Sequence, residues 1–204
     1  ARVSLFVGFS VAFLSTAAGL VIGLVSGFVR AADAVLMRIM DGLMAIPPIL
    51  LAIALMALTR ASIGNVILAI TIAEVPRVTR LVRSVVLGLR EQPFVEAARA
   101  AGTPGWRILV RHILPNTVPP LIVQATYICA SAIIIEAILS FLGAGTPPNI
   151  PSWGNIIADG RSLFQVAPYL VIVPSVFLSL TVLAVNLVGD GLRDALDPRL
   201  ARGL

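Results

Sequence analysis

Long uncharged stretches alternate with short charged ones along this chain. Residues without a charge run from Val3 to Val29, from Thr117 to Ile135 and from Ser162 to Gly189. A helix needs about 20 apolar residues to cross the hydrocarbon core of a bilayer, so each stretch predicts a membrane-spanning helix. The first stretch is rich in Gly, Ala and Ser, small residues that let helices pack closely in lipid.

Two interrupted stretches predict further spans. Residues 34–59 are mostly apolar, and the dipeptide Pro47-Pro48 is expected to break or kink their helix. The apolar run at 61–73 is too short to cross by itself, so its helix must continue through Glu74 towards Leu89. We therefore predict about five transmembrane helices.

Composition agrees with a membrane protein. Of the 204 residues, 58% are apolar and 12% are charged, whereas a soluble domain carries about 25% charged residues. Too few polar side chains are present to cover a water-soluble monomer. The single cysteine, Cys129, excludes a disulfide scaffold. The expected fold is an all-α integral membrane protein with one domain, residues 1–204.

The basic residues predict the orientation of the chain. All fifteen are arginine, and the net charge is +5. With five spans and the charged segment at 91–115 in the cytoplasm, all but Arg2, Arg60 and Arg161 lie on or near the cytoplasmic side, as the positive-inside rule requires. The C-terminus is then cytoplasmic, and Ala1 lies outside, so we expect an upstream helix to precede it. This basic balance is better explained by the membrane than by nucleic acid.

Residues 91–115 predict a helix, a sharp turn and a second helix. Pro93 suits the first turn of a helix, and Gly102 suits the position after its end, where a positive φ is common. Thr103 is expected to cap a second helix, with Pro104 at its first position, that ends before Pro115. The first helix also carries a predicted apolar patch, which outside the membrane needs a partner; its members are Phe94, Val95, Ala98 and Ala101.

The same segment carries a family resemblance. Glu96-Ala97-Ala98, Gly102 and Leu114-Pro115 resemble the EAA motif, which marks the permease subunits of bacterial ATP-binding-cassette (ABC) importers. His112 stands where the general pattern has Ile, a variant associated with the peptide/nickel branch. Other segments resemble that branch too, and the likeness covers nearly the whole chain, closest to the "C" permease of dipeptide and oligopeptide importers; these segments are residues 136–143, 151–155 and 189–199.

The resemblance implies the transmembrane domain of a type I ABC importer, with residues 91–115 as a coupling loop seated in a groove of an ATPase. The implied contact residues are Phe94, Glu96, Ala97, Ala98, Gly102, Leu114 and Pro115. The permease would form half of the pathway for peptides or a related small solute across the bacterial inner membrane. It would carry no catalytic residue and no cofactor. ATP would be hydrolysed on separate subunits, since this chain has no GxxxxGK[ST] phosphate loop.

The implied partners are a second permease subunit, usually in a heterodimer, two ATPase subunits, membrane lipid and a periplasmic or lipid-anchored solute-binding protein. Residues 143–161 are predicted to be an irregular extracytoplasmic loop with a short interfacial helix, in which Pro151 and Trp153 are candidate contacts of the binding protein. The ring of Trp153 would suit the headgroup region.

Two other classes of function are weighed against the importer. A channel or secondary transporter that works without ATPases would not need a helix–glycine–helix knob with an apolar patch. A membrane scaffold without transport activity would not need an acid, Glu136, inside an apolar helix or spans broken by prolines.

Several charged residues have two interpretations. Glu136 is either a pathway residue or inter-subunit contact, or it pairs with an arginine or backbone group of a neighbouring helix. Arg77, Arg80 and Arg83 are better explained as a basic inner-leaflet anchor than as a voltage sensor. Residues three apart on one helix face are expected to form the ion pairs Arg38–Asp41 and Glu74–Arg77. Helix capping and ion pairing explain the C-terminal acids better than a metal site does; these acids are Asp190, Asp194 and Asp197. With one histidine, His112, no histidine metal cluster is expected.

Overall fold

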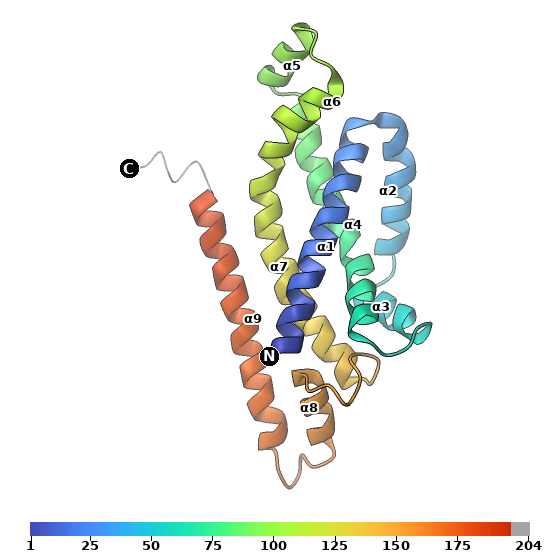
Figure 1. The fold of residues 1–204 in the computed structure, drawn as a ribbon, viewed down its shortest axis with the longest axis vertical. Coiled ribbons are helices and arrows are strands. Elements are labelled where there is room, and N and C mark those ends of the chain that lie inside the picture. Colours follow the sequence, from blue (N-terminus) through green and yellow to red (C-terminus); the bar gives the residue numbers. More distant parts are fainter. Residues whose placement is uncertain (197–204) are drawn as a thin grey trace.

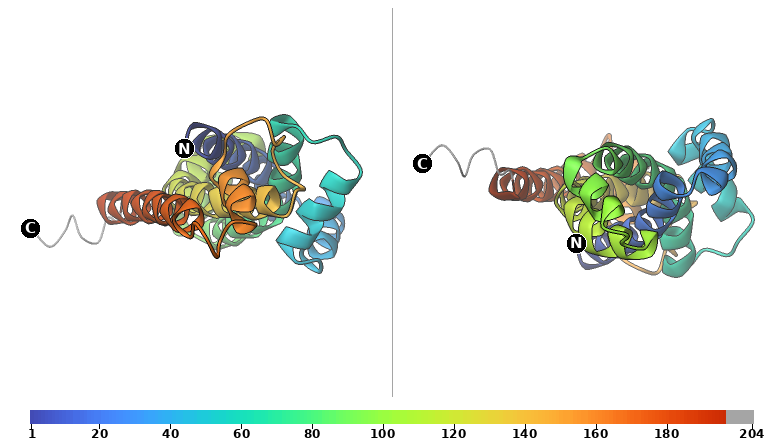
Figure 2. Two further views of the ribbon diagram at one scale, coloured as in Figure 1. Left: turned by 90° about the horizontal axis from the view of Figure 1, so that it is seen from below. Right: turned by 90° about the horizontal axis from the view of Figure 1, so that it is seen from above.

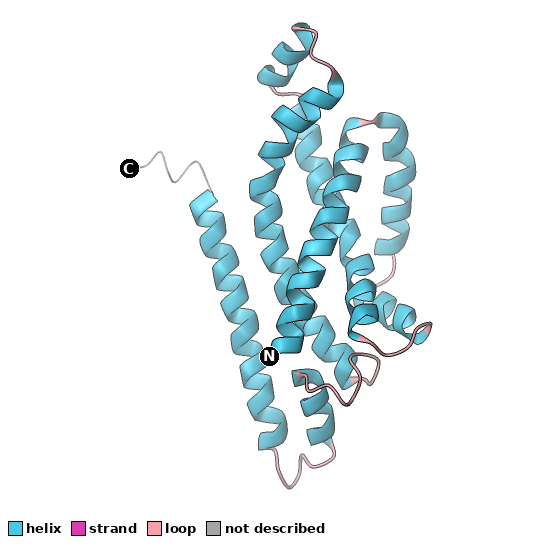
Figure 3. Cartoon of the chain, viewed as in Figure 1, coloured by secondary structure: helices cyan, strands magenta, loops and turns pink. Residues whose placement is uncertain are grey.

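The computed structural model describes residues 1–196 of the chain. These residues form helices and loops, without any strand (Figure 3), which confirms the all-α prediction. The elements are α1 Arg2–Phe28, α2 Arg30–Met44, α3 Pro48–Ala57, α4 Ile63–Arg90, α5 Pro93–Ala100, α6 Gly105–Ile108, the π-helical turn η1 Leu109–Ile113, α7 Leu114–Phe141, α8 Trp153–Arg161 and α9 Tyr169–Leu196.

Helices α1, α4 and α7 pack together as a central bundle along the long axis of the molecule (Figure 1). Helix α9 lies against α7 on one side of this bundle, and α2 and α3 lie on the opposite side (Figure 2). Helices α5 and α6 form a knob at one end of the long axis, and α8 lies at the other end (Figure 1). The 91–115 and 143–161 segments therefore occupy opposite ends of the molecule.

Three of the described helices are long and apolar enough to cross a membrane: α1, the continuous helix from Gly105 to Phe141, and α9. Helices α2 and α3 pass the same test only as a pair, bent by 87° at the break before Pro48. That break confirms the effect predicted for Pro47-Pro48. Helix α4 has 28 residues but carries Glu74 and several arginines, so the five-span count stays a prediction.

Glycines on one face of α1 set its close packing against α4. A Cβ atom added at Gly23 would lie 2.6 Å from Cβ of Val82, and one added at Gly27 would lie 2.7 Å from Cβ of Val86. Such separations are too short for real carbon contacts, so only glycine allows the two backbones to approach this closely. Both valines are buried. The small residues noted in the first stretch therefore form the tight seam between α1 and α4.

The second helix of the 91–115 segment differs from its prediction. Helix α6 begins at Gly105 after an N-cap at Pro104, so Thr103 is not the cap. The helix also does not end before Pro115 but continues through η1 into α7. In η1 the hydrogen bonds reach one residue further back, as when the N–H of Leu114 donates to the carbonyl of Leu109. Pro115, which lacks an N–H, follows this change of register and sits in the first turn of α7.

Candidate functional site

The turn between α5 and α6 is built as its sequence predicts. Pro93 is the first residue of α5. Gly102 has a φ of +74°, its N–H donates to the carbonyl of Arg99 at 2.9 Å, and the N–H of Thr103 donates to the carbonyl of Ala98 at 3.0 Å. This pair of bonds is the Schellman motif that ends a helix on a left-handed glycine. The knob therefore has a defined reversal and not a loose linker.

The exposed surface of the knob differs from the predicted patch. Val95 is fully buried in the core, so it is not part of any surface. Phe94 remains 42% exposed, with its ring centroid 6.3 Å from that of His112. Trp106 and Val110 are 64% and 55% exposed, although the sequence pattern did not single them out. A tryptophan on a short helix outside the predicted spans is the signal that could have identified Trp106. Of the other motif residues, Ala98 and Leu114 are half-buried and the rest exposed: Glu96, Ala97, Gly102 and Pro115.

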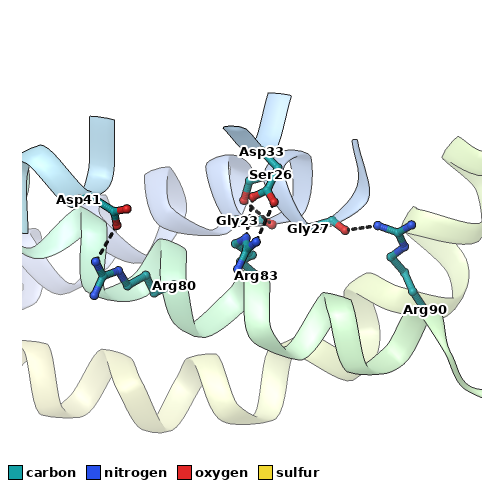
Figure 4. Close-up of polar contacts among 8 residues, drawn as sticks. All are labelled: Gly23, Ser26, Gly27, Asp33, Asp41, Arg80, Arg83 and Arg90. Carbon is teal, nitrogen blue, oxygen red and sulfur yellow. Dashed lines mark hydrogen bonds and ion pairs between the residues drawn. The ribbon is translucent and has the colours of Figure 1, made fainter. Parts of the chain in front are cut away.

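Arginines of α4 hold the α1–α2 turn near the knob (Figure 4). The guanidinium of Arg83 donates to both carboxylate oxygens of Asp33, at 2.6 and 2.7 Å. Arg90 donates to the carbonyl of Gly27 at 2.8 Å. Asp33 lies between the first two predicted spans, and the hydrogen bonds from Arg83 hold the pKa of its carboxyl below the ordinary value. At this end of the bundle, two arginines of α4 therefore hold a carboxylate of α2 and a backbone carbonyl of α1.

The other arginines of α4 also have acidic partners. Arg80 pairs with Asp41 at 2.6 Å, so the predicted Arg38–Asp41 pair is wrong; the longer-range partner on α4 takes the carboxylate. Arg77 lies 3.2 Å from Glu74, which confirms that pair. With Arg83 also paired, the three arginines of this repeat make ion pairs within the chain. Their role as an inner-leaflet anchor stays a prediction.

Glu136 lies in α7 near the opposite end, fully buried. Its two carboxylate oxygens accept hydroxyl hydrogens, one from Ser4 of α1 at 2.8 Å and one from Ser140 of α7 at 2.9 Å. Its partners are therefore hydroxyl groups, and not the arginine or backbone group of the structural interpretation; its role in the pathway or between subunits stays a prediction. The hydroxyl partners come from inside this chain.

The 143–161 segment contains the short helix that was expected, α8. Pro151 is exposed, whereas Trp153 is only 9% exposed and packs in the hydrophobic core. The ring of Trp153 therefore does not form part of the surface of this chain.

Other candidate groups carry no further site among residues 1–196. No cluster of three or more His, Cys, Asp or Glu side chains that could hold a metal lies within that range. Cys129 is buried in α7. Asp197 and the end of the 189–199 motif lie outside the described residues.

Curated relatives match nearly all of the chain. It is 55% identical over 202 residues to a probable peptide ABC transporter permease protein of Sinorhizobium fredii, covering 99% of this chain and 69% of the relative. It is 45% identical to a dipeptide transport system permease protein of Alkalihalophilus pseudofirmus and 44% to a glutathione transport system permease protein of Pectobacterium atrosepticum, covering 98% of this chain and 66% of each relative.

A solved structure shares the fold. A chain of the MetNI methionine ABC transporter, in an inward facing conformation, superposes with a TM-score of 0.78 at 22% identity, covering 96% of this chain and 94% of that one. The architecture is thus that of an ABC importer transmembrane domain. The model of the binding-protein-dependent transport system inner membrane component matches residues 19–202. From the helical knob, the apolar helices and these matches together, we conclude that the chain belongs to this family of inner-membrane permease subunits.

Proposed function

We propose that this permease moves short peptides, or small peptide-like solutes, through an ABC importer of the inner membrane. The names of its relatives, which include peptide, dipeptide and glutathione permeases, support this class of solute. The observation that carries the mechanism is the knob of α5 and α6, which presents exposed Phe94, Trp106 and Val110 at one end of a continuous helix. Apolar side chains at such an end need a protein partner.

The proposed partner at the knob is an ATPase subunit, which hydrolyses ATP in place of this chain. A second permease subunit, in a heterodimer, completes the pathway, and a periplasmic or lipid-anchored solute-binding protein docks at the opposite end. There, Pro151 is the exposed candidate for that contact. In this assembly, closure of the ATPases moves the knob, and the helix from Gly105 to Phe141 carries the movement across about 55 Å.

In the proposed orientation, the 91–115 loop and the C-terminus are cytoplasmic and the 143–161 loop is outside. The test uses an Asn149→Cys variant and a membrane-impermeant thiol reagent on intact cells, with the buried Cys129 as a low background. Labelling from outside is expected. A second variant, Ala101→Cys on the exposed knob, should react only after the cells are opened. The reverse pattern would contradict the orientation.

The function is tested by reconstituting the complex in liposomes with its ATPases and binding protein. ATP-dependent uptake of a labelled dipeptide is expected, together with ATP hydrolysis that rises when the loaded binding protein is added. Omission of the ATPases should abolish uptake. Uptake that persists without them would indicate a channel or a secondary transporter.

A further inference from the structure

Glu136 ends a chain of hydrogen bonds that reaches into the 143–161 loop. Ser140 donates to Glu136, and Ser140 in turn accepts the backbone N–H of Thr146 at 3.1 Å. The hydroxyls of Ser140 and Thr146 lie 2.9 Å apart. Asn155 of α8 donates through Nδ2 to the hydroxyl of Thr146 at 3.2 Å. This series of hydrogen bonds thus joins α7 to the 143–161 loop and to the start of α8.

The amide of Asn155 closes the loop upon itself. Its Nδ2 also lies within hydrogen-bond distance of the carbonyls of Pro147, at 3.1 Å, and Ile150, at 2.9 Å. Ser152 accepts the backbone N–H of Asn155 at 3.2 Å as the N-cap of α8. These side chains are buried, so their polar groups find partners in one another in place of water.

Two hydroxyl donors of this hydrogen-bond network point towards the carboxylate of Glu136. Ser4 and Ser140 each donate to a separate oxygen of Glu136. A carboxylate can accept at both oxygens, whereas the amide of glutamine must offer a donor at one of them. Because a buried polar group without a partner is costly, glutamine at this position would fit only if one of the serine hydroxyls turned to accept, which would change the hydrogen bonds that now join the loop to α7.

Close backbone packing accompanies the hydrogen bonds. A Cβ atom added at Gly154 would lie 2.7 Å from Cβ of Ser140, and one added at Gly145 would collide with the backbone of Ser140. The loop and the start of α8 therefore lie directly on the last turns of α7. The first turn of α1 joins the same cluster through Ser4.

We propose that Glu136 is a positioning residue that fastens the 143–155 loop to α7 and α1. The continuous helix from Gly105 to Phe141 then joins the ATPase-facing knob to the loop that meets the binding protein. A displacement of either end is transmitted to the other because the loop is attached to the helix. This inference rests on the proposed function for the direction of the signal, but the attachment itself does not depend on transport.

The test compares Glu136→Gln with wild type in the reconstituted complex. A spin label at an Asn149→Cys site reports the mobility of the loop, and ATP hydrolysis with and without the loaded binding protein reports the signal. The substitution is expected to raise the mobility of the label and to lower the stimulation ratio by about fivefold, as loss of one buried hydrogen bond would do. Thr146→Val, which removes only a hydroxyl in the loop, should change both readouts in the same direction and less.

The matched control is Ser131→Ala. Ser131 is also on α7, but its hydroxyl donates to Glu74 at 3.4 Å, outside this cluster, so both readouts should stay at the wild-type level. If Thr146→Val and Glu136→Gln both keep wild-type label mobility, the attachment is wrong. If the label becomes mobile and stimulation is unchanged, the role in signalling is wrong. A wild-type complex without any stimulation would overturn the proposed function instead, and label mobility would still decide the attachment.

Discussion

The two ends of the helix from Gly105 to Phe141 differ in which side chains they bury. At the knob, Trp106 and Val110 stand exposed although they are apolar. At the other end, Glu136 and Ser140 are buried although they are polar, and they are satisfied by hydrogen bonds within the chain. The first arrangement is complete only when a partner covers it, and the second is complete already. One helix therefore joins an apolar surface, which we propose contacts an ATPase, to a polar cluster whose hydrogen-bond partners lie within the chain.

The largest effect is expected from Gly23→Leu, which separates α1 from α4 and so disturbs both ends. Overpacking at this seam costs roughly 1–3 kcal/mol or more, because Val82 and the backbone near Thr79 cannot withdraw. The amount of folded permease in the membrane and its melting temperature in detergent should both fall. Gly42→Leu is the control, since a Cβ there meets nothing within 4 Å; equal losses for the two variants would contradict the seam.

Gly102→Val should affect only the knob. Valine at a φ of +74° is strained by about 1–2 kcal/mol, which should tilt α5 and move Glu96 away from the proposed ATPase groove. Membrane insertion should survive, while uptake and stimulated ATP hydrolysis fall together. Glu96→Ala should act in the same direction and more mildly. The control is Gly88→Val, at a helical glycine with open space around it. If Gly102→Val keeps wild-type uptake and stimulated ATP hydrolysis, the knob is an ordinary linker.

Trp106→Ala sharpens the comparison by removing apolar surface without bending the backbone. Loss of an aromatic contact at an interface costs on the order of 2 kcal/mol when the partner covers it, so the ATPase should bind more weakly by about 30-fold. The melting temperature of the permease alone should hardly change, because the ring is 64% exposed. Leu58→Ala, 85% exposed outside the knob, should leave ATPase affinity intact. Equal binding by both variants would exclude Trp106 from the interface.

The smallest effect is expected from Asp33→Asn, which breaks the ion pair with Arg83. The folded-state pKa of Asp33 is lowered, so the pair stabilises the protein above the ordinary carboxyl pKa and this contribution is lost as the pH falls through the lowered value. At neutral pH the partly exposed pair contributes under about 1 kcal/mol. The difference in melting temperature between wild type and variant should therefore shrink in acid. Asp159→Asn, on the exposed face of α8, is the control at neutral pH and should keep the wild-type melting temperature.

Local signals predicted the knob, because each of them acts within a few residues. Pro93 begins α5 and Gly102 ends it as their backbone preferences require. The break at Pro47-Pro48 is of the same kind. The motif residues that mark the family also lie in this segment, so fold and family could be inferred from the sequence.

Distant contacts could not be predicted in this way. Asp41 pairs with Arg80, 39 residues away, and not with Arg38 on its own helix. Glu136 accepts a hydrogen bond from Ser4, 132 residues away. Such partners are set by how the helices pack, which no local pattern records. The same limit applies to Trp153. Its position in an irregular loop predicts exposure, whereas the packing of α8 buries it.

The π-helical turn at Leu109–Ile113 also affects how the helix responds to a change in its length. A regular α-helix advances about 100° with each residue, and the wider turn accommodates an additional residue without changing the path of the axis. Deletion of one residue in this turn would therefore restore regular winding and leave the knob and α7 close to their present faces of the helix. An additional residue in the regular turns of α7 has no such place to be absorbed and would rotate the knob by about 100° relative to the bundle. The turn at Leu109–Ile113 is thus the place in this long helix where a change of one residue in length is expected to be tolerated best.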